Sequence, residues 1–474
     1  NEAFFRDSVR VANPNFKLVA DSLLFNTRTE VVTYLSPTVI YDKERVIYCE
    51  RGFYDAKREY GVFAQKAYYL NRGDNKTEKA TGDSIIYDGK KKQYYIVGNA
   101  TYSDDEQEVT ADSIYFDDAT QQYYFRGNPQ FRSKDSTQTQ RISAGNSHFD
   151  KASGDMIFSE GVRVSDKGQL LTADNLRYNK DRKDGTARGN AVFIDSTQNS
   201  QLRGGVIHYN DSTKSLLAYE KPAFQTVIDN DSIWLTADTL RSVQVDDSTA
   251  QARRLLRDST SSDTSQARHL YAYRDVRIFK NNLQALADSL FYDGLDSLFT
   301  LYRQPVLWAD SVQFTADTLR MQMRDKQLRS IDLLQNALII DEKDQTYYDQ
   351  IKGRYLTAHL DSSKIQTVDV RSNGEAIYYA QDGDKKYIGV NRVECSNMLL
   401  NFSDNQVQKI RFYVQPKATM MSMGKTDHSA LRLKGFLWRD AQRPRTKEDI
   451  LQRLPLPALP NATSAKEDAE KEEK

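Results

Sequence analysis

The sequence predicts an all-β fold, an elongated repeat solenoid in which two antiparallel sheets face each other. Three observations predict it. Tyr, Phe, Val, Ile and Thr, which suit a pleated and half-buried surface, stand between short clusters of Asp, Ser, Gly, Asn and Lys. Two short motifs alternate along most of the chain. Within each motif, apolar residues occupy every second position, which is the period of a strand.

The composition supports a folded chain with a thin core. The 474 residues include 28 Tyr and 20 Phe, too many aromatic residues for a disordered chain, while 28% of all residues are charged. Lys and Arg total 66 and Asp and Glu total 66, so no broad positive field is present and we expect no nucleic-acid partner. Two cysteines, Cys49 and Cys395, are too few for a disulfide framework.

The first motif reads apolar-Thr-Ala-Asp followed by Ser, Thr or Asn, an aliphatic residue and an aromatic one. Clear copies are VTADSIYF at 109–116 and LTADNLRY at 171–178. The residue in the Asp position recurs at intervals of about thirty residues, at 83, 112, 145, 174, 205 and 238. The apolar phase changes by one residue within this motif, and a strand tolerates such a change only where it bends. We therefore expect corners at Asp21, Asp112, Asp174, Asp238, Asp288 and Asp317.

The second motif follows each first motif after a polar turn. It reads Gly-Asn and then alternating apolar residues, as in RGNPQF at 126–131 and RGNAVF at 188–193. The opposite phase carries polar residues such as Gln130 and Arg163, so each repeat should present one apolar and one wet face. The apolar phase predicts inward positions at Ala100, Tyr102, Phe131, Val162, Val164, Leu176, Ala191, Phe193, Phe224, Val276, Ile278, Leu307, Ala337 and Ile339.

Stacked repeats of this kind bury a continuous core and leave an open strand edge at each end. The predicted organisation is one solenoid over residues 1–245 and 269–440, with a polar insertion loop at 246–268. A short helix is expected within 441–454, placed to cover the last strands, and a disordered tail over 455–474. Open edges also favour head-to-tail association of copies.

The tandem repeats, Ala-Asp-x-Leu-x-Tyr followed by Gly-Asn-Val-x-Ile, resemble the organic-solvent-tolerance (OstA) family. This family includes the periplasmic lipopolysaccharide-transport proteins LptA and LptC and the N-terminal domain of LptD. The copies cover residues 18 to 420, and their number in tandem is what makes the signal specific. The resemblance implies a twisted β-taco or β-jellyroll and a non-enzymatic bridge toward the outer membrane. It also implies that the fourteen inward residues line a groove for lipid A acyl chains.

The resemblance further implies a periplasmic protein that pairs end to end with other Lpt-type jellyrolls. No run approaches the roughly 20 apolar residues of a membrane span, and residues 1–15 lack the apolar stretch of a signal peptide. We therefore expect an exported chain whose signal peptide has been removed. The five histidines, at 148, 208, 269, 359 and 428, show no metal-ligand spacing, and no cofactor is expected.

Three other interpretations remain open from the residues alone. The inward phase also fits a closed core without a groove. A β-solenoid scaffold or adhesin would use the same repeat without an interior ligand. A β-helix enzyme acting on polysaccharides would need a unique cluster of acidic or basic residues on one face, whereas the acidic residues here recur in every repeat.

Overall fold

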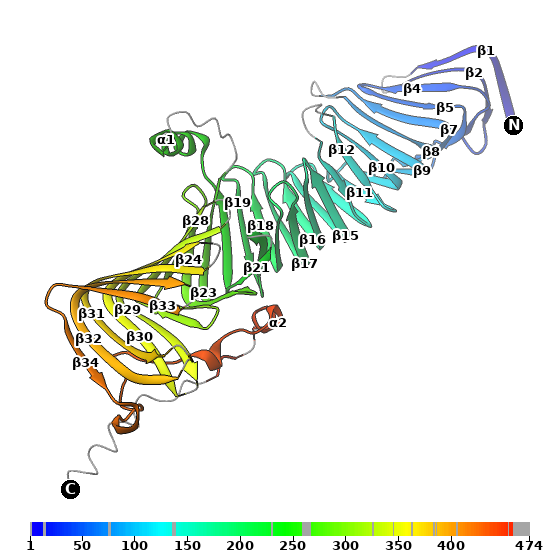
Figure 1. Ribbon diagram of the computed structural model, residues 1–474. Coiled ribbons are helices and arrows are strands. Elements are labelled where there is room, and N and C mark those ends of the chain that lie inside the picture. Colours follow the sequence, from blue (N-terminus) through cyan, green and yellow to red (C-terminus); the bar gives the residue numbers. More distant parts are fainter. Residues whose placement is uncertain are drawn as a thin grey trace, which may run out of the picture. The chain divides into compact units, whose positions relative to one another are not determined.

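The computed structural model describes residues 2–12, 16–73, 77–134, 139–228, 231–257, 267–324, 327–344, 346–361, 364–382, 384, 386–403, 406–453 and 455–457. The chain divides into two compact units, Asn1–Ser212 and Thr213–Lys474. Each unit consists of antiparallel strands that follow one another along the chain (Figure 1). The predicted all-β class is confirmed, with two facing walls of strands in each unit.

The strands of the first unit are β1 (Glu2–Ala12), β2 (Lys17–Asn26), β3 (Val31–Tyr34), β4 (Thr38–Asp42), β5 (Arg45–Cys49), β6 (Arg51–Asp55), β7 (Tyr60–Asn71), β8 (Glu78–Asp88), β9 (Gln93–Ser103), β10 (Gln107–Asp117), β11 (Gln122–Arg126), β12 (Gln130–Ser133), β13 (Arg141–Ser143), β14 (Asn146–Asp150), β15 (Asp155–Asp166), β16 (Gln169–Asn179), β17 (Asp184–Asp195) and β18 (Ser200–Asn210).

The elements of the second unit are β19 (Ser215–Tyr219), β20 (Ala223–Ile228), β21 (Asp231–Thr236), β22 (Thr239–Gln244), α1 (Asp247–Arg257), β23 (Arg268–Lys280), β24 (Leu283–Asp293), β25 (Leu298–Tyr302), β26 (Val306–Ala309), β27 (Val312–Thr315), β28 (Thr318–Arg324), β29 (Gln327–Asp344), β30 (Tyr347–Asp361), β31 (Lys364–Gln381), β32 (Tyr387–Ser403), β33 (Gln406–Tyr413), β34 (Lys417–Met421), the 3-10 turns η1 (Met423–Lys425) and η2 (Asp440–Gln442), and α2 (Lys447–Leu451).

Each long strand bends near its middle and contributes one half to each of two walls. The bend appears as a register shift, between Ala111 and Ser113 in β10 and between Arg188 and Ala191 in β17. We call wall A the set of half-strands that contains Phe131 in the first unit and Leu307 in the second. Wall B is the set that contains the other half-strands, and the bends join the two walls along one edge.

The corners combine the two sequence motifs on neighbouring strands. At the Gly-Asn motif both residues take positive φ, 75° at Gly189 and 46° at Asn190, so the chain turns through the left-handed region where Gly and Asn are tolerated. The Asn190 side chain donates to Asp174 Oδ2 of the adjacent strand at 3.1 Å. The prediction of corners at the six aspartates is confirmed, because each lies at such a break in register or between two strands.

Two segments depart from the expected organisation. The predicted insertion loop begins as helix α1, whose Arg253 pairs with Asp293 at 3.1 Å and with Asp296 at 2.7 Å, while residues 258–266 lie outside the described ranges. Helix α2 lies within the expected range 441–454, but it contacts β21 and β23 rather than the last strands. Most of the expected tail, residues 458–474, is also outside the described ranges.

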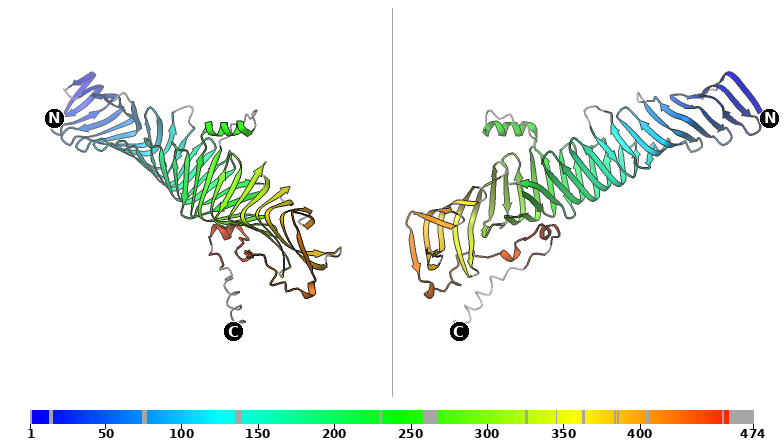
Figure 2. Two further views of the ribbon diagram at one scale, coloured as in Figure 1. Left: turned by 90° about the vertical axis from the view of Figure 1, so that its left-hand side faces the viewer. Right: turned by 45° about the vertical axis from the view of Figure 1, so that its right-hand side comes forward.

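Residues 423–453, which we call the strap, lie against the outer face of wall A in the second unit (Figure 2). Leu433 is buried among Leu338, Ile340, Ile377 and Val390, which point away from the interior. Phe436 and Trp438 of the strap both contact the ring of Tyr348. Wall A of this unit is apolar on both faces, and an apolar face of a sheet must be buried against another element. The strap covers the outer face.

Candidate functional site

The predicted inward residues of wall A form continuous cross-strand rows. In the first unit, Tyr102 pairs with Val109, which pairs with Phe131, and the row continues through Ile142 to Val164. Beyond it, Leu171 joins Val164 to Phe193. Ala100, Val162 and Ala191 stand beside this row, close to the corners, and are almost completely buried. Alternation in the sequence therefore identified the inward face of wall A.

The second unit continues the same arrangement within itself. Phe224 pairs with Leu235, Leu235 with Ile278, and Ile278 with Ala285. Ala285 then pairs with Leu307, which leads through Phe314 to Ile339. Val276 and Ala337 lie near the corners and are 1% and 0% exposed. Of the fourteen predicted residues, eleven are buried, whereas Val164, Phe193 and Phe224 are partly exposed.

Wall B supplies an inward face that the sequence-based prediction largely missed, since it named only Leu176 there. In the first unit the row is Ile85, Ile96, Ile114, Phe125, Ser147, Phe158, Leu176 and Ala187. In the second unit it is Leu240, Ala272, Leu290, Leu301, Leu319, Leu333, Leu356, Val370 and Met398. The available signal was the second phase of the first motif, as in Leu176 and Tyr178.

The interior of the first unit is aromatic, and its rings join the two walls. Phe131 of wall A contacts Phe125 at 5.3 Å and Phe158 at 5.1 Å between ring centroids, both in edge-on geometry. Tyr102 of wall A lies 5.2 Å from Tyr123 of wall B. Such ring pairs add to the free energy gained by burying apolar area. The walls of this unit are therefore in direct contact through these aromatic side chains.

In this interior, tyrosine hydroxyl groups lie close to the turns. Burial raises the pKa of Tyr94, Tyr102 and Tyr123, because the charged phenolate is poorly solvated there. Tyr102 donates to Glu78 Oε1 at 3.2 Å, and the ring centroids of Tyr69 and Tyr94 lie 5.0 Å apart with the rings tilted. These phenols stay neutral at physiological pH, so they act as amphipathic lining groups between the apolar interior and the charged turns.

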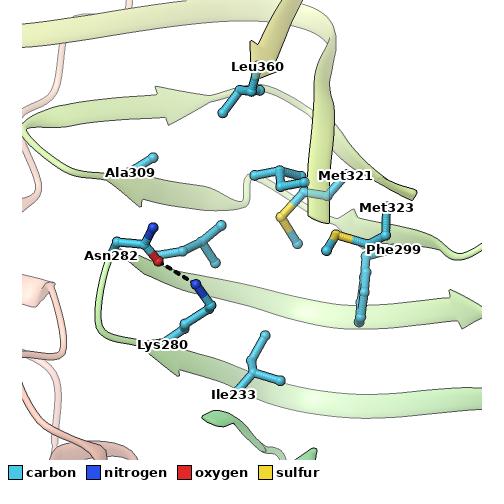
Figure 3. Close-up of a pocket in the computed structure, with 10 residues that line it drawn as sticks. Ile233, Lys280, Asn282, Phe299, Ala309, Met321, Met323 and Leu360 are labelled. Atoms are coloured by element: carbon cyan, nitrogen blue, oxygen red, sulfur yellow. Dashed lines mark hydrogen bonds between the residues drawn. The ribbon is translucent and has the colours of Figure 1, made fainter. Parts of the chain in front are cut away.

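An apolar cavity of about 30 Å³ lies between the walls of the second unit (Figure 3). Wall A contributes Ile233, Lys280, Asn282, Leu283 and Ala309, and wall B contributes Phe299, Met321, Met323, Leu328 and Leu360. Lys280 is 6% exposed and its Nζ donates to Asn282 Oδ1 at 2.8 Å, beside the cavity. A space of this volume holds about one water molecule, so a larger ligand enters only when the walls move apart.

The outer face of wall B in the first unit carries a line of aromatic rings that contact one another. Tyr95, Tyr115, Tyr124 and His148 follow one another with centroid distances of 4.8, 5.5 and 4.4 Å. Tyr94 is 4% exposed and its neighbour Tyr95 is 39% exposed, so one ring of the pair points inward and the other outward, as expected from alternation. A surface hollow of about 420 Å³ lies beside Tyr124, His148 and Ile157.

Within the described ranges, no three His, Cys, Asp or Glu side chains gather as a metal site would require. Cys49 and Cys395 are both free thiols, and burial raises the pKa of the Cys49 thiol to about 12. None of the helices in the described part of the chain combines the length and the apolar character of a membrane span.

These features define the class of protein: a β-solenoid of the taco or jellyroll kind, with two walls and an apolar interior. Residues 1–122 match the LptA/(LptD N-terminal domain) LPS transport protein family, which confirms the resemblance carried by the repeats. Among solved structures, the chain is similar to LptH of Pseudomonas aeruginosa, described as the LptA homologous periplasmic component of the conserved lipopolysaccharide transport device. The identity is 11%, the match covers 28% of this chain and 82% of that chain, and the TM-score is 0.22. No curated protein matches the chain.

Proposed function

We propose that this chain carries lipopolysaccharide in the periplasm, as a non-enzymatic bridge that holds lipid A acyl chains between its walls. The observation that carries the proposal is the unbroken row of inward apolar residues in each unit, from Tyr102 to Phe193 and from Phe224 to Ile339. The match of residues 1–122 to a family of LPS transport proteins supports the choice of cargo.

The physical basis is the transfer of acyl chains from water to an apolar interior. Each square ångström of apolar surface removed from water contributes about 25 cal/mol. A row built from repeats offers similar side chains at every step, so a lipid meets no strongly preferred stopping point and moves along it. In the second unit the apolar cavity between the walls is about 30 Å³, so an acyl chain enters this cavity only when walls A and B separate there.

The terminal strands support end-to-end pairing with other Lpt-type jellyrolls. One edge of β1 pairs with β2. In the described part of the chain, no strand pairs with the other edge of β1. Phe4 and Phe5 of β1 are 47% and 45% exposed, and at the other end Met420 of β34 is 55% exposed. Exposed strand edges with apolar side chains favour the addition of a strand from a partner.

Photo-crosslinking in cells that make lipopolysaccharide tests the proposal with matched neighbours on one strand. A photoreactive residue replaces inward Val164, Phe193 or Phe224, and the controls replace outward Arg163, Val192 or Gln225. Lipopolysaccharide should be crosslinked at the inward positions at several times the level of the outward controls. Equal labelling at both sets, or crosslinking of proteins alone at the outward set, would refute the carrier and favour a scaffold.

A further inference from the structure

The outer ends of the two walls in the first unit meet through three ion pairs. Arg45, at the start of β5 in wall A, lies 2.8 Å from Asp118, in the turn after β10 in wall B. Lys151, in the turn after β14 in wall B, lies 2.6 Å from Glu78, at the start of β8 in wall A. We call the edge where the two sets of turns meet the mouth, and its ion pairs the rim ladder.

The third pair has the same placement. Lys180, in the turn after β16 in wall B, pairs with Glu106, in the turn before β10 in wall A. The partners are 73, 73 and 74 residues apart in sequence, so every pair joins positions separated by the same number of bent strands. The rim ladder therefore recurs with the repeat, although the cation stands on wall A in the first pair and on wall B in the other two.

The rim ladder lies directly over the aromatic interior. The side chain of Glu78 is 8% exposed, and it accepts hydrogen bonds from Tyr102 at 3.2 Å and Tyr123 at 3.5 Å as well as from Lys151. The side chain of Asp118 is 14% exposed. Ion pairs that are partly removed from water are screened less than exposed pairs, so the contacts of Glu78 and Asp118 hold the two rims together more strongly than the contact of Glu106, whose side chain is 63% exposed.

We infer that the rim ladder is a latch that closes the mouth of the first unit, and that Arg45, Lys151 and Lys180 bind phosphate groups of the lipid when it opens. This inference rests on the proposed function. An amphiphile whose acyl chains enter between the walls places its headgroup at the mouth, where the three cations lie. A phosphate offers these cations the same charge-assisted hydrogen bonds as the carboxylates of Asp118, Glu78 and Glu106. Exchange of carboxylate for phosphate then opens the mouth: each cation keeps an anionic partner, and the released carboxylates are hydrated as the mouth opens.

Two triple variants separate the latch from the phosphate sites. D118N/E78Q/E106Q removes the carboxylates and keeps the cations, whereas R45Q/K151Q/K180Q removes the cations. The control R177Q deletes an ion pair of similar geometry, Arg177 to Asp155 at 2.6 Å, that joins two strands of wall B and does not cross the mouth. The probes are lipid A with two phosphates and the same lipid A with both phosphates removed, each dispersed in detergent.

The carboxylate variant should bind phosphorylated lipid A about tenfold more tightly than the unaltered chain, because its cations are free for phosphate. The cation variant should bind both probes with nearly equal affinity, and R177Q should behave like the unaltered chain. A cation variant that retains the full preference for phosphorylated lipid A would overturn the phosphate sites.

Opening of the mouth is measured separately and without lipid. Spin labels at Lys43 and Ala119, in exposed turns of walls A and B, report the distance across the mouth after the native cysteines are replaced (C49A, C395S). Both triple variants should broaden this distance distribution to longer values, and R177Q should not. An unchanged distribution in both would overturn the latch. If the mouth opens in the variants but no chain binds either lipid A, the proposed function and the phosphate sites fail while the latch stands.

Discussion

The side chain of Gln350 pairs with the backbone on both sides of Arg432 as if it were another strand. Its Oε1 accepts from the Leu433 amide at 2.8 Å and its Nε2 donates to the Leu431 carbonyl at 3.0 Å. Gln313 repeats the arrangement with the Arg439 amide and the Leu437 carbonyl, both at 2.8 Å. Both glutamine side chains are fully buried on the outer face of wall A, so two polar side chains anchor the strap there.

Replacing Gln350 with Leu should loosen the strap. The change removes both hydrogen bonds to the strap and leaves the Leu433 amide and the Leu431 carbonyl without their partner in a buried site, at a cost of about 1–3 kcal/mol. Hydrogen exchange at the Leu433 amide should become faster, and proteolysis within residues 423–453 should increase. Gln130→Leu, on the exposed face of β12, is the control and should leave strap exchange unchanged. Equal exchange in Q350L and the unaltered chain would show that apolar packing alone holds the strap.

Asp349 should make the second unit sensitive to pH. Burial raises the pKa of Asp349 from 3.8 to about 6, and this rise is opposed by Lys343, whose Nζ lies 3.2 Å from Asp349 Oδ2. Because the folded-state pKa is the higher one, the contribution of this carboxyl to stability is complete below about pH 3.8 and is lost as pH rises through about 6.

Asp349→Asn should therefore gain stability relative to the unaltered chain between pH 4 and pH 7, by about 1–3 kcal/mol. The amide oxygen still accepts from the Tyr379 amide, which lies 2.8 Å from Asp349 Oδ1 in the native chain. Urea unfolding at several pH values measures the difference. Asp361→Asn, at a surface carboxyl 3.2 Å from Arg329, should show no such trend. A constant difference at all pH values would contradict the assignment.

Tyr94 and Tyr95 allow a comparison of the inner and outer faces of wall B at adjacent positions. Tyr94 is 4% exposed and contacts Tyr87 at 4.7 Å and Tyr69 at 5.0 Å, whereas Tyr95 is 39% exposed. Tyr94→Ala should lower the free energy of unfolding by about 3–5 kcal/mol, because it leaves a cavity in a packed interior. Tyr95→Ala should cost less than about 1 kcal/mol. Thermal unfolding followed by near-ultraviolet circular dichroism measures both, and similar losses would mean that the interior collapses around the deletion.

Gly189 and Gly161 test the corners. Both have positive φ, 75° and 76°, but a Cβ at Gly189 would lie 2.3 Å from Asp174 Oδ2, whereas a Cβ at Gly161 meets nothing within 4 Å. Gly161→Ala should cost about 1–2 kcal/mol for its backbone conformation alone. Gly189→Ala should cost more, and adding D174A to G189A should bring the loss in unfolding free energy back toward that of G161A. If the double variant is no more stable than G189A, the clash with Asp174 is not the cause.

Much of the fold follows from local pattern. The inward placement of Phe131 and Val162 could be read from alternation, because a strand shows successive side chains to opposite faces. The corners at Asp112 and Asp174 could be read from the change of phase, because a strand that changes phase must bend. The sequence-based prediction missed the interior face of wall B in most repeats. The first motif spans the bend, so its apolar residues follow one alternation before the bend and the opposite alternation after it.

The sequence alone determined the strand class, the bends and the apolar faces, since these depend on residues within about thirty positions of one another. Only the tertiary structure decided that Lys151 contacts Glu78, 73 residues away in sequence. This contact depends on the orientation of wall A relative to wall B. The same holds for Gln350 and Leu433, 83 residues apart, where a segment without strand periodicity covers an apolar outer face. Local pattern sets which side chains point inward, while the twist and packing of whole walls set which distant side chains meet.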